Sequence, residues 1–264
     1  MKPAPFEYEL AQSVDEALEL LGEDAKVLAG GQSLVPLLNF RLARPERLVD
    51  VNRLAELAYL RRSHGILRIG AVTRQATLER SPLVAGHWPL LAQAVSLVGH
   101  PQIRNRGTVG GSIAHADPAA ELPVALTALD ARFHARSRRG TRTLAAGELF
   151  LGPLTTALED DELLIEIEVP PLPAGARTAF VEHARTHGDF AIAGAAVVVA
   201  PDHAAIALLG AGSVPVRASA AERALVGGAS AREAAAVAAE LVDSEHRAAL
   251  LGELVRQAIG RASG

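Results

Sequence analysis

Two glycine pairs, Gly30-Gly31 and Gly110-Gly111, most constrain how this 264-residue chain can fold. The first lies in KVLAGGQSLVPLL (residues 26–38), where it ends an apolar strand and Ser33 then begins an apolar helix. The second lies in GHPQIRNRGTVGGSIAHADPAAELP (residues 99–123), which we interpret as a tight junction of strand, loop and helix. Glycine lacks a Cβ and adopts positive φ easily, so such a backbone can turn several N–H groups toward one anion.

The second stretch also contains the start of a helix. Asp117 followed by Pro118 is typical of an N-cap with proline at the first helical position, and Glu121 then falls in the first turn, where the helix dipole favours negative charge. Neither stretch is a Rossmann fingerprint or a P-loop. A single glycine pair most often marks a turn. Two pairs, each followed by a serine, predict two walls of one cleft for a phosphate-bearing ligand.

Composition excludes several classes of function. The chain has no cysteine, which rules out disulfides, thiolate zinc sites, cysteine nucleophiles and iron–sulfur clusters held by this chain's own cysteines. Its 26 basic and 30 acidic side chains give a net charge of −4, and aromatic residues are 3%, which argues against nucleic-acid binding. We expect neither a signal peptide in MKPAPFEYEL nor a transmembrane segment, so a cytoplasmic protein is the expectation.

The order of elements predicts a mixed fold. The first fifty residues predict strands and helices in alternation, at residues 5–10, 13–22, 26–29, 33–42 and 47–51. Further along we expect hairpins at 57–72 and 132–144, a helix capped by Thr73, helices at 82–98 and 118–129, and a strand at 163–169. Beyond the PPLPAGA segment (170–176) we expect three short strands within 177–209 and three short helices after Arg217.

Three stretches resemble a known family. AGGQSLVPLLNFRLARPERLVDVNR (29–53) and HPQIRNRGTVGGSIAHADPAAELP (100–123) are similar to the two FAD signatures of the medium subunits of molybdenum hydroxylases, the xanthine dehydrogenase and carbon monoxide dehydrogenase group. ARTHGDFAIAGAAV (184–197) resembles the start of that family's C-terminal domain. The resemblance covers essentially the whole chain.

The resemblance implies an α+β fold with two domains. The first, residues 1–172, is an FAD-binding domain of the PCMH type, like that of vanillyl-alcohol oxidase, with subdomains of about 1–54 and 55–172. The second, residues 177–264, combines a three-stranded antiparallel sheet with a helix bundle. Both sets of boundaries are expectations from the resemblance and from the proline-rich segment between them.

The resemblance also implies which residues bind FAD, without a covalent link. It assigns FAD, chiefly its pyrophosphate, to Ala29, Gly30, Gly31, Gln32 and Ser33 on one wall and to Thr108, Val109, Gly110, Gly111 and Ser112 on the other. Leu28, Leu34 and Gly107, which flank these residues, are expected to be further cofactor-binding residues. It gives Asp117 and Glu121 polar contacts to the cofactor, and places Leu163, Leu164 and Phe190 against the flavin ring. It implies no catalytic side chain and no metal ligand in this chain. Phe190 stands where some relatives have a tyrosine.

Simpler interpretations of these residues stay open at this stage. Asp117 can be a helix cap and Glu121 a first-turn charge with no cofactor role, and Phe190 can be core. Arg104 and Arg106 are either solvated or directed at a partner subunit.

Histidines offer two further alternatives. His183 and His187 are four residues apart, but on a segment predicted to be a strand and without a third ligand they are expected to be ordinary polar residues. His115 lies inside the second signature and can be either structural or directed at the cofactor.

The function implied by the resemblance is electron transfer. FAD would take electrons from 2Fe-2S clusters on a small partner subunit, fed by molybdopterin on a large one, and pass them to an acceptor such as NAD, a quinone or oxygen. The expected assembly is a dimer of heterotrimers. The alternatives are a stand-alone flavin oxidase of the vanillyl-alcohol-oxidase type and a non-catalytic scaffold that keeps the fold without FAD.

Overall fold

A small parallel sheet holds the N-terminal fifty residues in this computed structural model, which describes residues 2–264. Its strands alternate with two helices as predicted: β1 (Glu7–Leu10), α1 (Val14–Leu20), β2 (Ala25–Leu28), α2 (Leu34–Asn39) and β3 (Arg47–Asp50). The sheet order is β1-β3-β2, so β2 and β3 end side by side at one edge. The predicted helix to residue 42 is too long, because α2 stops where Arg41 adopts a positive φ of 56°.

A five-stranded antiparallel sheet follows, in the order β4-β5-β10-β6-β7. Its strands are β4 (Leu60–Ser63), β5 (Ile66–Gly70), β6 (Arg132–Ser137), β7 (Gly140–Ala145) and β10 (Leu163–Val169). Both predicted hairpins are confirmed, and β10 has the predicted bounds. Because β10 lies in the middle, the LLIEIEV strand joins the two hairpins into one sheet.

Short helices fill the segment between the two hairpins. They are α3 (Gln75–Glu79), α4 (Pro82–His87), α5 (Pro89–Leu97), α6 (Pro101–Arg106), α7 (Val109–His115) and α8 (Glu121–Ala128). The prediction of one helix over 82–98 is wrong, because the helix is interrupted at Trp88. The next residue, Pro89, disfavours helical geometry at the residue before it. The Trp88 indole N–H instead donates to the Pro170 carbonyl at 2.7 Å.

Three predicted caps differ from those observed. The Thr73 hydroxyl donates to the Tyr59 carbonyl at 2.9 Å, and Arg74 occupies the N-cap position of α3. The glycine-rich stretch is preceded by a helix, α6, and not by a strand. Asp117 does not cap α8, which begins at Glu121; its carboxylate accepts the Ala119 N–H at 2.8 Å in the turn before it. Ser33 stands before α2 but makes no capping hydrogen bond.

Further small elements complete the N-terminal two thirds of the chain. They are the 3-10 helix η1 (Ala55–Leu57), α9 (Ala146–Leu149) and the two-stranded pair β8 (Phe150–Gly152) and β9 (Thr155–Thr156).

The C-terminal part is a second antiparallel sheet with three helices. The predicted three strands are present as β11 (Arg177–His183), β12 (Ala193–Ala200) and β13 (His203–Leu209), and the two-residue β14 (Val216–Arg217) extends the edge. The helices are α10 (Ser219–Val226), α11 (Ala231–Ala239) and α12 (Glu245–Ser263). The last has 19 residues and is longer than predicted. In the described residues 2–264, no helix is both long and apolar enough to cross a membrane.

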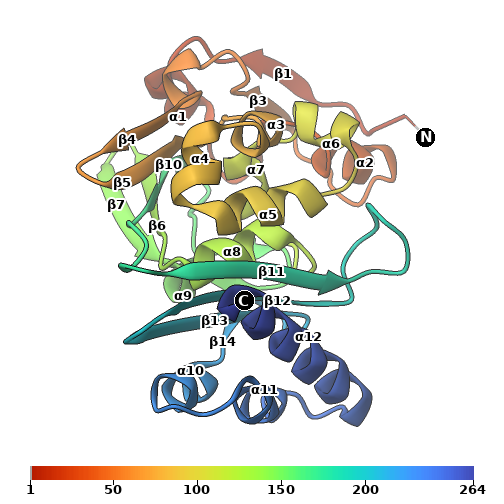
Figure 1. Cartoon of the computed structure of the whole chain (residues 1–264). Helices are drawn as coiled ribbons and strands as arrows, with labels where there is room; N and C mark the ends of the chain where they lie inside the picture. The colour runs from red at the N-terminus through yellow and green to blue at the C-terminus, as the bar shows by residue number, and fades with distance from the viewer. Residues whose placement is uncertain (1) are drawn as a thin grey trace.

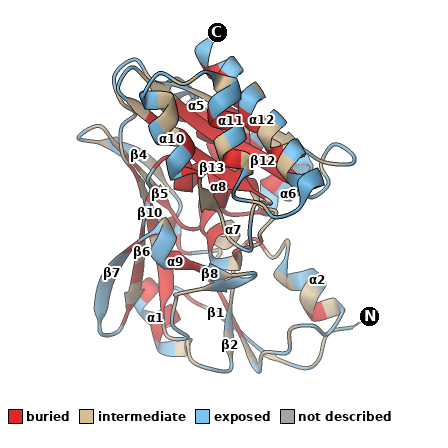
Figure 2. Cartoon of the chain, turned by 90° about the horizontal axis from the view of Figure 1, so that it is seen from below, coloured by how far each residue is buried: buried red, intermediate tan, exposed pale blue. Residues whose placement is uncertain are grey.

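The C-terminal sheet lies between two layers of helices, α5 and α8 on one face and α10, α11 and α12 on the other (Figure 1). Along β12 the side chains alternate: Ala195 and Val197 belong to the core under the C-terminal helices, whereas Ala196 and Val198 belong to the core shared with α5 and α8. Buried residues run through β12, β13 and α8, while the outer faces of the C-terminal helices are exposed (Figure 2). The sheet therefore shares its core with the N-terminal part of the chain.

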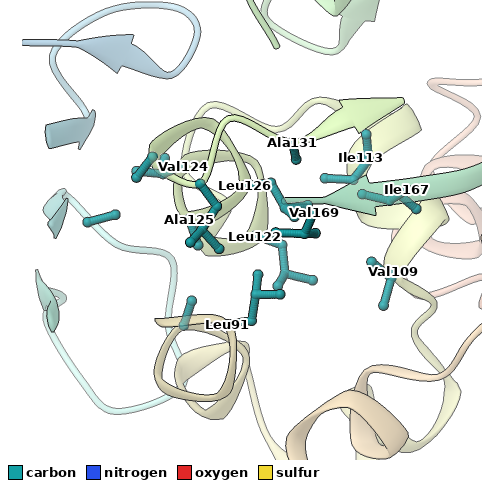
Figure 3. Packing of buried hydrophobic residues seen from close by; sticks show 14 of the residues in the cluster. Leu91, Val109, Ile113, Leu122, Val124, Ala125, Leu126, Ala131, Ile167 and Val169 are labelled. Atoms are coloured by element: carbon teal, nitrogen blue, oxygen red, sulfur yellow. The ribbon is translucent and has the colours of Figure 1, made fainter. Parts of the chain in front are cut away.

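The shared core continues to the glycine-rich stretch. Leu91, Leu122 and Leu126 gather with Ile167 and Val169 of β10, and Val109 and Ile113 of α7 lie alongside (Figure 3). Packing at the start of α7 is thus continuous with the largest apolar cluster of the molecule.

This packing makes Leu126 a test of the shared core. Leu126→Ala is expected to lower the free energy of unfolding by about 2–5 kcal/mol, because the cavity forms in a fully buried site. Urea denaturation followed by circular dichroism measures the change. Leu241→Ala is the matched control, since Leu241 is 45% exposed. Equal losses in the two variants would contradict the described core.

Candidate functional site

The two glycine stretches meet in the folded chain. We call residues 29–34 loop 1, which follows β2 and ends at the first residue of α2, and residues 107–112 loop 2, which follows α6 and includes the first turn of α7. A Cβ atom placed on Gly30 would lie 2.5 Å from the Arg106 carbonyl oxygen and 2.7 Å from the Gly107 Cα. A Cβ placed on Gly111 would lie 3.8 Å from the Cβ of Ala29. The predicted two walls are therefore in contact, and Gly30 is required by that contact.

Loop 1 presents a run of unpaired amides. Within the described residues, the backbone N–H groups of residues 30–34 donate to no other group of the protein. Gly31 has a φ of 72°, the left-handed geometry that lets successive N–H groups converge. The Gln32 side-chain amide donates to the Gly30 carbonyl at 2.9 Å and so holds the loop in shape. This arrangement fits an anion such as a phosphate group.

Loop 2 uses its amides differently. The Val109 and Gly110 N–H groups donate to the carbonyls of Thr73 and Ala71, at 2.9 and 2.8 Å. The Gly111 N–H donates to the Thr108 hydroxyl at 3.1 Å, which caps α7. Most of the amides that the resemblance assigned to the anion are therefore occupied within the chain. Loop 2 supports loop 1 and brings the half-buried Ser112 to its side.

Basic residues beside the loops have distinct tasks. Arg104 is neither solvated nor free for a partner: it is 7% exposed, forms two hydrogen bonds with the Glu79 carboxylate at 2.9 and 2.8 Å, and donates to the Val98 and Gly99 carbonyls. It anchors α6. Arg74 lies against loop 2, where burial and then the nearby Arg106 lower the pKa of its guanidinium. The loops thus lie next to positive charge.

Two carboxyl groups further along the chain, one buried and one half-buried, have raised pKa values. Glu121 is 6% exposed, and burial raises its pKa to about 7, with Glu182 and Asp117 adding to the shift. Burial also raises the pKa of Glu182 on β11 to about 7, and its Oε2 is buried without a hydrogen-bond partner in the described structure. The same effect lowers the pKa of His115. Near neutral pH these two carboxyl groups are therefore partly protonated, and the protonated form can donate a hydrogen bond.

The residues assigned to the flavin ring lie in contrasting places. Leu163 and Leu164 begin β10 and are 5% and 4% exposed, packed in two different apolar clusters. Phe190 is 69% exposed on the connection between β11 and β12. In that connection a Cβ on Gly188 would lie 2.4 Å from the His100 ring. The tip of the β11–β12 connection therefore contacts the start of α6. The structure leaves the Phe190 side chain open to solvent.

Histidines 183 and 187 take no part in the one group of metal-ligand type found within residues 2–264. His187 packs against His100, with ring centroids 6.3 Å apart. The metal-like group is His134, Glu166 and Glu168, which the sequence analysis missed. Arg68 lies between the two glutamates and pairs with them at 2.6 and 2.9 Å. We therefore interpret it as an ion-pair network of the five-stranded sheet.

Two residues at the loop junction also escaped the sequence analysis. Asn52 donates to the Ala29 carbonyl at 2.5 Å and accepts from Arg74 at 2.8 Å. The available signal was topological: parallel strands β2 and β3 end at the same edge, so a polar residue just after β3 must face the residue that follows β2.

Family comparisons match both parts of the chain. Residues 4–172 match the family model "FAD binding domain in molybdopterin dehydrogenase", and residues 178–253 match "CO dehydrogenase flavoprotein C-terminal domain". The chain belongs to the molybdenum hydroxylase flavoproteins. Its fold class, FAD cofactor and oxidoreductase type are those predicted for a medium subunit of this family.

Individual relatives give the same result. The 6-hydroxypseudooxynicotine dehydrogenase complex subunit alpha of Paenarthrobacter nicotinovorans is 49% identical over 86% of this chain and 79% of that protein. The carbon monoxide dehydrogenase medium chain of Hydrogenophaga pseudoflava is 38% identical over 99% of this chain and 98% of that protein. A solved structure of that carbon monoxide dehydrogenase, lacking the Mo-pyranopterin moiety, superposes with a TM-score of 0.94 at 41% identity, covering 100% of this chain and 99% of that chain.

The residues present fit the cofactor. Loop 1 offers consecutive amides for a pyrophosphate, and Gly30 removes the side chain that would otherwise push the loops apart. The fit comes from this chain's own geometry and agrees with the family match.

Gly30→Ala tests the loop contact. Its Cβ would collide with backbone atoms of residues 106 and 107, so FAD affinity is expected to fall by about 100-fold or more, as for a buried steric clash of a few kcal/mol. Flavin fluorescence titration of the deflavinated protein measures it. Gly86→Ala is the control, because a Cβ there meets nothing within 4 Å. Unchanged affinity in Gly30→Ala would show that FAD does not depend on this contact.

Glu121 gives a pH-dependent stability. Its folded pKa of about 7 lies above the ordinary 4.5, so the native state keeps a proton that the unfolded state releases between these values. Stability from this group is therefore lost as pH rises from about 4.5 to 7. Relative to the parent chain, Glu121→Gln should gain about 1–3 kcal/mol of unfolding free energy between pH 5 and pH 8.

The measurement is urea denaturation of the FAD-free chain at both pH values. Glu19→Gln, on the exposed face of α1, is the control and should differ from the parent chain equally at both. A pH-independent difference for Glu121→Gln would contradict a raised carboxyl pKa.

Proposed function

We propose that this chain is the FAD-binding electron-transfer subunit of a molybdenum-containing hydroxylase complex. The run of free amides in loop 1, seated on loop 2, carries this proposal together with the family match along both parts of the chain. Because the chain has no cysteine, the 2Fe-2S clusters belong on a small partner subunit and the molybdopterin on a large one. FAD passes the electrons to an external acceptor such as NAD, a quinone or oxygen.

In the proposed site each part of the chain has its own task. Loop 1 binds the pyrophosphate through its amides and the exposed Ser33 hydroxyl, and loop 2 holds loop 1 in place. Glu121, whose pKa of about 7 leaves it partly protonated near neutral pH, would contribute a polar contact to the cofactor, and Asp117 shapes the turn before it. Leu163, Leu164 and Phe190 would lie against the flavin ring. When bound, FAD supplies the capacity to accept and release electrons singly or in pairs.

The assembly we propose is a dimer of heterotrimers in the cytoplasm. Two relatives are named as subunits: subunit alpha of the 6-hydroxypseudooxynicotine dehydrogenase complex and subunit beta of caffeine dehydrogenase. We also propose that the chain divides into domains 1–172, with subdomains near 1–54 and 55–172, and 177–264, since the proline-rich segment 170–176 separates the two family matches. The substrate of the complex is then selected on the large subunit.

An absorbance spectrum tests this proposal. The chain, expressed with its neighbouring genes, is expected to purify with large and small subunits and to show a flavin band near ~450 nm that denaturation releases as free FAD. Reduction of that flavin by substrate should require the partner subunits. Flavin turnover by the isolated chain would support the stand-alone oxidase instead, and absence of flavin under every condition would support the scaffold.

A further inference from the structure

We propose that Asn52 and Arg74 form a clasp that sets the spacing of loop 1 and loop 2 and so positions the chain to receive FAD. Neither residue belongs to either loop, and neither was assigned a role by the family resemblance. The effect on FAD affinity depends on the proposed function, whereas the clasp itself is a property of the chain alone.

Asn52 holds the loop 1 side. Its Nδ2 donates to the Ala29 carbonyl at 2.5 Å and to Asp50 Oδ1 at 2.8 Å. Asp50 also accepts the Asn52 N–H at 2.8 Å and the Tyr8 hydroxyl at 2.6 Å. With two acceptors facing its Nδ2, the Asn52 amide has one favourable orientation, which turns Oδ1 toward Arg74. The end of β3 is thereby tied to the first residue of loop 1.

Arg74 holds the loop 2 side. One guanidinium nitrogen, Nη2, donates to Asn52 Oδ1 at 2.8 Å, and the other, Nη1, donates to the Arg106 carbonyl. This carbonyl oxygen is the atom that approaches Gly30 most closely. The backbone of Arg74 is itself held beside Thr108 by an antiparallel bridge. A single planar group therefore links Asn52, which is bonded to loop 1, to Arg106, which directly precedes loop 2.

The charges around Arg74 explain why this position takes arginine. Within the described residues no carboxylate pairs with Arg74 directly; Asp50 attracts it through Asn52, and Arg106 repels it. A planar fork can donate to two acceptors in fixed directions, whereas lysine offers one point charge. An anion on loop 1 would balance the positive charge of Arg74, so the clasp also favours anion binding at loop 1.

The clasp acts by preorganisation. Within the described residues, the backbone N–H groups of residues 30–34 donate to no protein group, so the position of loop 1 depends on the residues that contact it. Fixing a binding loop before the ligand arrives removes an ordering cost from binding. Loss of the clasp should therefore weaken FAD binding while leaving the sheets and the shared core intact.

The test compares Arg74→Gln, Arg74→Lys, Asn52→Ala and the double variant Asn52→Ala/Arg74→Gln in the full chain. FAD dissociation constants come from flavin fluorescence with deflavinated protein. Each single variant is expected to weaken binding about 10-fold or more, as for loss of hydrogen bonds to a charged group. Because the two residues act as one unit, the double variant should lose little more than either single variant. Arg74→Lys should resemble Arg74→Gln, since charge alone does not close the clasp.

Arg53→Gln is the matched control. Arg53 adjoins Asn52, carries the same charge as Arg74 and is exposed, with no hydrogen bond described for its guanidinium. FAD affinity in this variant should stay within about twofold of the parent chain, as for an ordinary surface substitution. Full retention of affinity in Arg74→Lys, or additive losses in the double variant, would overturn the clasp as the reason for the effect.

Hydrogen exchange of the FAD-free chain separates the clasp from the proposed function. Peptides covering residues 103–112, whose amides are hydrogen-bonded, are expected to exchange faster in Asn52→Ala and Arg74→Gln, while peptides from β12 and β13 keep their protection. Unchanged exchange in loop 2 would overturn the clasp even if FAD binds normally. If the parent chain binds no FAD, faster loop exchange in the variants would sustain the clasp and the proposed function alone would fail.

Discussion

The close approach of two backbone segments, Gly30 against the carbonyl of Arg106, is the constraint on which the rest of the site depends. It joins the parallel sheet of the first fifty residues to the helices above the five-stranded sheet. Such an approach is open only to glycine. Around it, three independent sets of hydrogen bonds fix the partners: Arg104 anchors α6, Gly110 is seated on Ala71, and Gln32 shapes loop 1.

Because of this constraint, two loops that look alike in the sequence have different roles. Both have a glycine pair followed by a serine, and both lie at or just before the start of a helix. Only loop 1 keeps its amides free, because loop 2 lies within reach of the Thr73 and Ala71 carbonyls at the end of β5. The difference is tertiary: the glycines predict where backbone can approach, but the neighbouring carbonyls decide which amides remain for a ligand.

The same distinction explains what could be predicted. Strand β10 and both hairpins follow from alternating apolar residues and turn residues, which are local properties. The break at Trp88 was missed because the apolar pattern continues across it, and α6 was missed because Arg104, its buried residue, is polar and held by Glu79. Likewise the raised pKa of Glu121 arises from burial beside Glu182 on β11, a neighbour that no local pattern indicates.

The connection between β11 and β12 has a length that its two points of support determine. These strands are antiparallel neighbours, so the connection leaves and re-enters one end of the sheet, and the sheet is fixed by packing against α5 and α8. At its tip Gly188, with a φ of 83°, rests on the ring of His100. The span between these supports is therefore set from both sides. Exposed positions such as Arg185 can accept other side chains, but adding or removing a residue would move Gly188 away from His100 at the start of α6.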